Sequence, residues 1–198
     1  MISKNLKKSL AESSWIRRMF EKGAELKQEY GEDRVFDFSL GNPDLESPPE
    51  FNRVLKKEAA KTGSFLHGYM ANAGYAETRE AVAAQLSKES NLNFEKEHIV
   101  MTVGAAGAMN VALKSILDPG DEVIVFKPYF VEYDFYIDNH QGKKVMAETT
   151  NQLLPDLDSL RNQISENTKA VIINSPNNPT GRVYPEELFE QLANILED

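Results

Sequence analysis

The stretch that decides the fold is "KAVIINSPNNPTGRVYPEELF", Lys169 to Phe189. It opens with an apolar run typical of a buried strand and closes with a helical pattern. Between them lies "NSPNNPTGRVYP", Asn174 to Pro185, with three prolines, three asparagines and one glycine. A strand-to-helix connection usually needs only about 2–6 residues. A loop this long and this rich in proline therefore indicates a functional role in addition to connecting the two elements.

The same alternation of strand and helix extends backwards to about residue 93. Short apolar runs predict strands, and apolar residues at helical spacing predict a helix after each of them. Near-continuous apolar strands in this order favour a parallel sheet covered by helices on both faces, an α/β fold. The predicted strands are "HIVMTV" (98–103), "EVIVF" (122–126), "KKVMAE" (143–148) and "KAVIIN" (169–174).

The first 90 residues predict three helices and one short strand. A helix is expected over 14–30 and another over 76–90, while the alternating "VFDFSL" (35–40) predicts a strand. Ser47 and Glu50 have the spacing of a capping box, with Pro48 as the first residue of the helix that follows.

The composition excludes several classes of function. The net charge of -9 argues against a nucleic-acid partner. The absence of cysteine rules out disulfides, thiolate catalysis and zinc–thiolate sites, and the three histidines lack metal-ligand spacing, so no metal is expected. The N-terminus lacks the apolar core of a signal peptide, and no run approaches the ~20 apolar residues of a membrane span. We expect a cytoplasmic protein without a membrane partner.

Three unusual loops follow predicted strands: "GAAG" (104–107), "KPYF" (127–130) and "SPNNPTG" (175–181). In a parallel sheet they open at the same edge, where ligands bind. Helix-start amides at "GAAG" could hold an anion, although tight packing explains the small residues equally well. Phe130 could stack on a planar ligand, although core packing is the simpler explanation. Asn178 could donate to a ligand or merely form a turn.

Five stretches occur in order and at the separations found in one family. With them the chain resembles the class I/II aminotransferases, the pyridoxal 5'-phosphate enzymes of fold type I, over nearly its whole length from about Ile16. The stretches are "LGNPD" (40–44), "YMANAGYAETREAV" (69–82), "TVGAAGAMNVAL" (102–113), "LDPGDEVIVFKPYFVEY" (117–133) and "NSPNNPTGRVY" (174–184).

The resemblance implies a cofactor site. Gly104, Ala105 and Ala106 match the turn whose backbone binds the cofactor phosphate, without the serine or threonine that many members have there. Phe130 matches the aromatic residue that stacks on the pyridine ring. Asn178 matches the asparagine that donates to the ring hydroxyl oxygen.

The resemblance also implies what lies around that site. Tyr69 matches a tyrosine that reaches the phosphate in a neighbouring subunit, so a homodimer is expected. Gly41 matches a glycine near the substrate carboxylate. The Schiff-base lysine is expected beyond Asp198, so no catalytic residue is assigned and the chain as given is expected to be inactive.

The resemblance implies the fold and activity of the whole protein. We expect a truncated α/β/α large domain at 48–198, incomplete at its C-terminus, and an N-terminal arm with part of a smaller domain at 1–47. The expected activity is transfer of an amino group from an amino acid to a 2-oxo acid. Alternatives are a lyase or synthase of the same fold, or a non-catalytic binding domain. A nicotinamide-binding module is disfavoured because G-x-G-x-x-G is absent.

Overall fold

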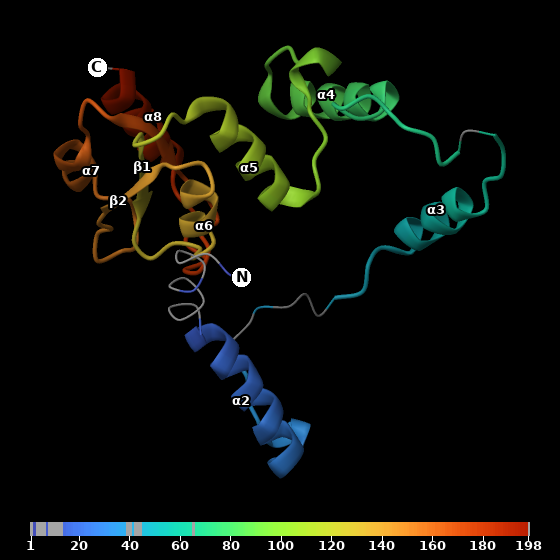
Figure 1. Cartoon of the computed structure of the whole chain (residues 1–198), viewed down its shortest axis with the longest axis horizontal. Coiled ribbons are helices and arrows are strands. Elements are labelled where there is room, and N and C mark those ends of the chain that lie inside the picture. Colours follow the sequence, from blue (N-terminus) through green and yellow to red (C-terminus); the bar gives the residue numbers. More distant parts are fainter. Residues whose placement is uncertain are drawn as a thin grey trace. The chain divides into compact units, whose positions relative to one another are not determined.

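The computed structural model describes residues 2, 7, 14–38, 41, 45–64 and 66–197 of the 198-residue chain (Figure 1). The chain divides into two compact units, Met1–Gly68 and Tyr69–Asp198. Within the described part of the chain, no helix combines the length and apolar character that crossing a bilayer requires.

The first unit contains helix α2 (Ser14–Tyr30), a 3₁₀ turn η1 (Glu32–Arg34) and helix α3 (Pro49–Ala59). Helix α2 has the predicted bounds. The predicted strand over 35–40 is wrong for residues 35–38, which form no ladder, and residues 39–40 lie outside the described residues. The alternation of Phe36 and Phe38 is typical of a strand, but both side chains are exposed (82% and 94%), and no described segment pairs with them.

The predicted capping box at the start of α3 is also wrong. The helix begins at Pro49, and the residue before it, Pro48, makes no side-chain capping bond. Glu50 is instead paired with Arg53, one turn further along the helix. Pairing at this spacing competes with the backward reach that a capping box needs.

The sheet of the second unit has three parallel strands: β1 (Glu122–Phe126), β2 (Lys143–Ala147) and β3 (Thr168–Ile172). Their order is β2-β1-β3, so β1 is central. All three coincide with predicted strands to within a residue or two. Ile124 on β1 is opposite Val145 on β2 and Val171 on β3, which sets the register.

Helices link and cover these strands. The helix predicted over 76–90 has those bounds. The Asp156 carboxylate caps the first turn of α7 by accepting a hydrogen bond from the backbone N–H of Ser159 at 2.9 Å. The helical elements of this unit are α4 (Ala76–Ser90), η2 (Lys96–His98), α5 (Gly104–Ile116), α6 (Tyr133–Asp138), α7 (Leu157–Gln163) and α8 (Glu186–Glu197).

Two hydrophobic cores lie on opposite faces of β1, because successive strand residues point to opposite sides. Ile124 and Phe126 pack with residues of α7 and α8. Val123 and Val125 pack with residues of α5 and α6. The sheet is therefore the middle layer of an α/β/α sandwich, with α6 and α7 in different outer layers (Figure 1). The predicted fold class is confirmed.

The predicted strand "HIVMTV" is wrong. Residues 98–103 contain the end of η2 and an extended segment without ladder partners, although Ile99 has strand-like dihedral angles. Met101 N–H donates to the Ala73 carbonyl at 2.9 Å, a single bond rather than a ladder. Val103 is 94% exposed. A strand needs a neighbouring edge to pair with, and no described segment provides one here.

Candidate functional site

The Asn-Pro loop, residues 174–185, follows β3 and is closed by its own hydrogen bonds. Gly181 adopts φ of 69°, which favours glycine, and its N–H donates to the Asn177 carbonyl at 2.6 Å. Asn177 N–H donates to the Arg182 carbonyl at 2.9 Å. The Ser175–Pro176 and Asn178–Pro179 bonds are cis. Since proline has no N–H to donate, the loop is held by hydrogen bonds of its other residues, including the hydroxyls of Ser175 and Thr180.

The aromatic loop, residues 127–132, follows β1 and is anchored to the strand beside it. Lys127 N–H donates to the Ala147 carbonyl at 3.0 Å, and the Thr149 hydroxyl donates to the Lys127 carbonyl at 2.8 Å. Phe130 is half-buried and meets Tyr133 edge to face, with ring centroids 5.7 Å apart. The backbone of the loop is thus fixed from the β2 side.

A polar cluster strengthens this anchor. The Lys144 ammonium, on β2, donates to the Tyr129 hydroxyl and, at 2.8 Å, to the Asp134 carboxylate. It also lies 5.0 Å from the centre of the Tyr129 ring. Burial lowers the pKa of Lys144, but the bonds to Asp134 and Tyr129 outweigh burial, so that the pKa is raised. Burial raises the pKa of Tyr129. The lysine stays charged and the phenol stays neutral at ordinary pH.

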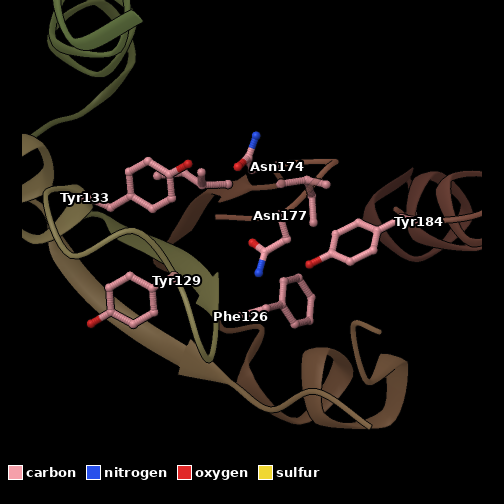
Figure 2. Close-up of a pocket in the computed structure, with 8 residues that line it drawn as sticks. Phe126, Tyr129, Tyr133, Asn174, Asn177 and Tyr184 are labelled. Atoms are coloured by element: carbon pink, nitrogen blue, oxygen red, sulfur yellow. The ribbon is translucent and has the colours of Figure 1, made fainter. Parts of the chain in front are cut away.

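Asn177 joins the two loops. Its side-chain Nδ2 donates to the Pro128 carbonyl at 3.2 Å and to the Thr180 hydroxyl at 3.0 Å, and the residue is only 8% exposed. In Figure 2 its amide lies in the middle of the group, with the hydroxyl of Tyr184 pointing toward it and Phe126 close by. The loops that follow β1 and β3 are therefore tied together beyond the carboxyl ends of adjacent strands.

The hollow between these loops is small. It is lined by aromatic, isoleucine and asparagine residues and has a volume of about 10 Å³, roughly enough for one water molecule. Tyr133 points its hydroxyl toward the hollow and Tyr129 points away from it (Figure 2). A pyridine ring does not fit inside, so any planar ligand has to bind outside this hollow.

The first turn of α5 presents backbone amides at its N-terminus, of which the Gly104 N–H already donates to the Thr102 carbonyl at 3.1 Å. Gly104 has φ of 68°, where a side chain is strained, and Ala105 and Ala106 are exposed. The preceding residue, Val103, makes no side-chain capping bond. The first N–H groups of a helix lack partners within it and carry a partial positive charge. This turn can bind an anion through its backbone.

The structure brings only some of the predicted site residues together. The loops of Phe130 and Asn178 are joined through Asn177. Asn178 itself is exposed, and its N–H donates to the Asn174 side chain at 3.0 Å. Among the described residues, no hydrogen bond or ring contact connects Gly104, Ala105 or Ala106 with these two loops, so their shared role stays a prediction.

Two predicted residues lie apart from these loops in the chain. Tyr69, the first residue of the second unit, is fully exposed. Gly41 belongs to the first unit and is also exposed. The roles of Tyr69 at a neighbouring subunit and of Gly41 near a carboxylate stay predictions.

Sequence analysis missed Asn177 and Lys144. Asn177 stands beside Asn178 in the same motif and drew no attention of its own. Its partner, the Pro128 carbonyl, lies 49 residues away, and no local spacing reveals such a bond. Lys144 could have been noticed as a charged residue inside a predicted strand, although Lys143 and Lys169 also lie in predicted strands and are exposed.

Known proteins resemble this chain closely. The sequence pattern of the family "Aminotransferase class I and II" matches residues 33–198. Aspartate/prephenate aminotransferase of Thermus thermophilus is 38% identical over 159 residues, 79% of this chain and 40% of that protein. Aspartate aminotransferase of Pyrococcus horikoshii is 35% identical over 191 residues, 96% of this chain and 46% of that protein.

Comparison with solved structures also matches the chain to an aminotransferase. The crystal structure of an amino transferase from Eubacterium rectale superposes with a TM-score of 0.91 at 35% identity, covering 100% of this chain and 50% of that one. The chain thus spans about half the length of the relatives it matches. It belongs to the class I and II aminotransferases.

Proposed function

We propose that the whole protein is a pyridoxal 5'-phosphate-dependent aminotransferase. It transfers an amino group from an amino acid to a 2-oxo acid and works as a cytoplasmic homodimer. One structural observation carries the proposal: the bond from Asn177 to Pro128 joins the loops of Phe130 and Asn178 at the carboxyl ends of adjacent strands. That edge is where α/β sheets bind their ligands.

The residues present fit pyridoxal phosphate in three respects. The uncapped first turn of α5 offers amides for the phosphate. Phe130 is half-buried and stands beyond β1, where its face can stack on the pyridine ring. The Asn178 side chain is exposed and has no hydrogen-bond partner among the described residues, so its amide is free to donate to the ring hydroxyl oxygen.

The chain's own residues supply binding and orientation. When bound, the cofactor acts as the electron sink for proton removal from the amino-acid Cα. The backbone of Gly104, Ala105 and Ala106 holds the phosphate, Phe130 fixes the plane of the ring, and Asn178 fixes its rotation. Gly41 leaves room for the substrate carboxylate. The lysine that moves the proton is proposed to follow Asp198 in the whole protein.

Aspartate is the substrate that we propose to assay first, because the relatives from Thermus thermophilus and Pyrococcus horikoshii carry that name. We propose that Tyr69 reaches the cofactor phosphate of a second subunit, which its full exposure supports. We also keep the proposed division into an arm at 1–47 and a cofactor-binding domain at 48–198.

Titration of the whole protein with pyridoxal phosphate tests the proposal. We expect stoichiometric binding, a visible absorption band, and oxaloacetate production from aspartate and 2-oxoglutarate. Light scattering should give the mass of a dimer. Binding without amino transfer to any 2-oxo acid would favour a lyase, a synthase or a non-catalytic domain, and absence of binding would reject the proposal altogether.

A further inference from the structure

Asn177 stands out from every other residue of the Asn-Pro loop. In the part of the chain that the structure describes, no other polar or charged residue is buried, apart from two tyrosines. A polar side chain is usually buried only where its hydrogen bonds are satisfied. Both of its amide protons have partners, Pro128 and Thr180. Its backbone N–H and carbonyl are paired as well, with Arg182 and Gly181.

The two adjacent asparagines therefore have different roles. Asn177 faces inward, and both side-chain N–H groups donate to other residues of the protein. Asn178 faces outward, and its one hydrogen bond to another described residue is from its backbone N–H to the Asn174 side chain. The side-chain donors of Asn177 are therefore not available to a ligand. The residue can, however, decide where its neighbour points.

The aromatic loop does not depend on Asn177 for its own position. It is anchored to the β2 side by the backbone bonds of Lys127 and by the Lys144 contacts with Tyr129 and Asp134. Of the hydrogen bonds among the described residues, the one from Asn177 to Pro128 alone joins the Asn-Pro loop to the aromatic loop. Without it the aromatic loop keeps these anchors, whereas the Asn-Pro loop loses its hydrogen bond to the aromatic loop.

We propose that Asn177 is a positioning residue, which holds the Asn178 amide at a fixed place relative to the ring-stacking residue Phe130. The inference rests on the proposed function, because it needs a planar ligand with a hydroxyl oxygen. Asn177 acts on that one contact. It leaves stacking on Phe130 and phosphate binding at α5 unchanged.

The test uses the whole protein and the change Asn177→Asp, which keeps the shape but replaces the donor with an acceptor-only carboxylate. Asn151→Asp is the matched control, since Asn151 is exposed and its side chain has no hydrogen bond among the described residues. The readout is the dissociation constant of pyridoxal phosphate, compared with that of an analogue lacking the ring hydroxyl. Circular dichroism and the thermal midpoint check folding.

We expect Asn177→Asp to weaken pyridoxal phosphate binding about ten-fold, the usual scale for one lost hydrogen bond. Binding of the analogue should change less than about two-fold, as should both ligands with the control. Combined with Asn178→Ala, the change should add almost nothing to Asn178→Ala alone, because both act through one contact. The pH midpoint of the bound cofactor's absorption band should shift in the same direction in both single variants.

Equal weakening of both ligands, or effects that add fully in the double variant, would mean that Asn177 only supports the fold and would overturn the inference. If Asn177→Asp does not fold, Asn177→Ser, which keeps a hydroxyl donor of shorter reach, is measured in the same way. Failure of the unaltered protein to bind pyridoxal phosphate would instead overturn the proposed function, so the two failures are distinct.

Discussion

At the scale of single residues, the sites that matter most are those whose bonds cross long stretches of sequence. Phe130 and Asn178 could be identified from the sequence because each stands inside a local motif. The partners of Lys144 and Asn177 could not be identified, since the Lys144–Tyr129 bond spans 15 residues and the Asn177–Pro128 bond spans 49. Such pairings depend on which strands become neighbours, and no spacing rule contains that information.

Replacing Lys144 should loosen the aromatic loop. Lys144→Met keeps the aliphatic stem but removes the charge that bonds to Tyr129 and Asp134. We expect a loss of about 1–3 kcal/mol in the free energy of unfolding, since hydrogen bonds to charged groups are lost from a half-buried site. Urea denaturation measures this change in the free energy of unfolding. The adjacent Lys143 is exposed, so Lys143→Met should change stability by less than about 0.5 kcal/mol, and equal losses would contradict the assignment.

The same cluster predicts a dependence on pH. The folded pKa of Lys144 is raised above 10.5 and that of Tyr129 above 10.0. A raised pKa means that the contribution to stability is complete below the unfolded value and is lost as the pH rises through the folded value. Stability should therefore fall as the pH rises above the ordinary values of 10.0 for tyrosine and 10.5 for lysine, and the fall should be shallower in Lys144→Met. Denaturation midpoints measured at a series of pH values test this dependence.

At the scale of elements, two runs that look alike in sequence have different structures. "EVIVF" became the central strand β1, whereas "HIVMTV" remained unpaired. Composition predicts that both prefer an extended backbone, and the dihedral angles of Ile99 agree. What differs is the presence of neighbours, because β1 has a partner on each side. Strand propensity can be judged from a segment alone, but pairing cannot.

A matched pair of valines measures this difference. Val123 on β1 is 0% exposed and Val103 is 94% exposed. We expect Val123→Ala to cost about 2 kcal/mol or more, from lost burial and the cavity it leaves. Val103→Ala should cost less than about 0.5 kcal/mol. Chemical denaturation of the two variants is the measurement, and a large effect of Val103→Ala would indicate a packed environment that the structure does not have.

The N-terminus of α7 should depend on its cap. Asp156→Ala removes the acceptor for the Ser159 N–H, and we expect a cost of about 0.5–2 kcal/mol. Asp156→Asn should restore most of it, because asparagine is an equally good cap. Glu166 is exposed and without a side-chain partner among the described residues, so Glu166→Ala is the control. Thermal unfolding compares the three, and an alanine variant as stable as the control would refute the role.

At the scale of the whole molecule, both hydrophobic cores lie in the unit Tyr69–Asp198. The structural boundary falls after Gly68, about one helix later than the division after residue 47 that the sequence predicts. Helix α3 lies between these two points. The start of α3 was predicted to within a residue. Which unit the helix belongs to depends on tertiary contacts, and a sequence pattern does not contain them.

Removing residues 1–68 should leave the second unit folded. Among the described residues, the two cores contain none that precedes Tyr69, so we expect cooperative unfolding with a free energy within about 1 kcal/mol of that of the intact chain. Hydrogen exchange checks the result residue by residue. Strong protection at Ile124 and Val125 should persist, and its disappearance would show that the first unit is needed for the sheet.

The two-sided packing of β1 constrains how this chain can change in length over evolution. Ile124 serves one core and Val125 the other, so inserting or deleting one residue in the strand would send every following side chain to the wrong core. Exchanges between similar apolar residues keep both cores, but gaps do not. Homologous sequences of different length should therefore align without gaps across 122–126 and accommodate their insertions in surface turns such as 149–154.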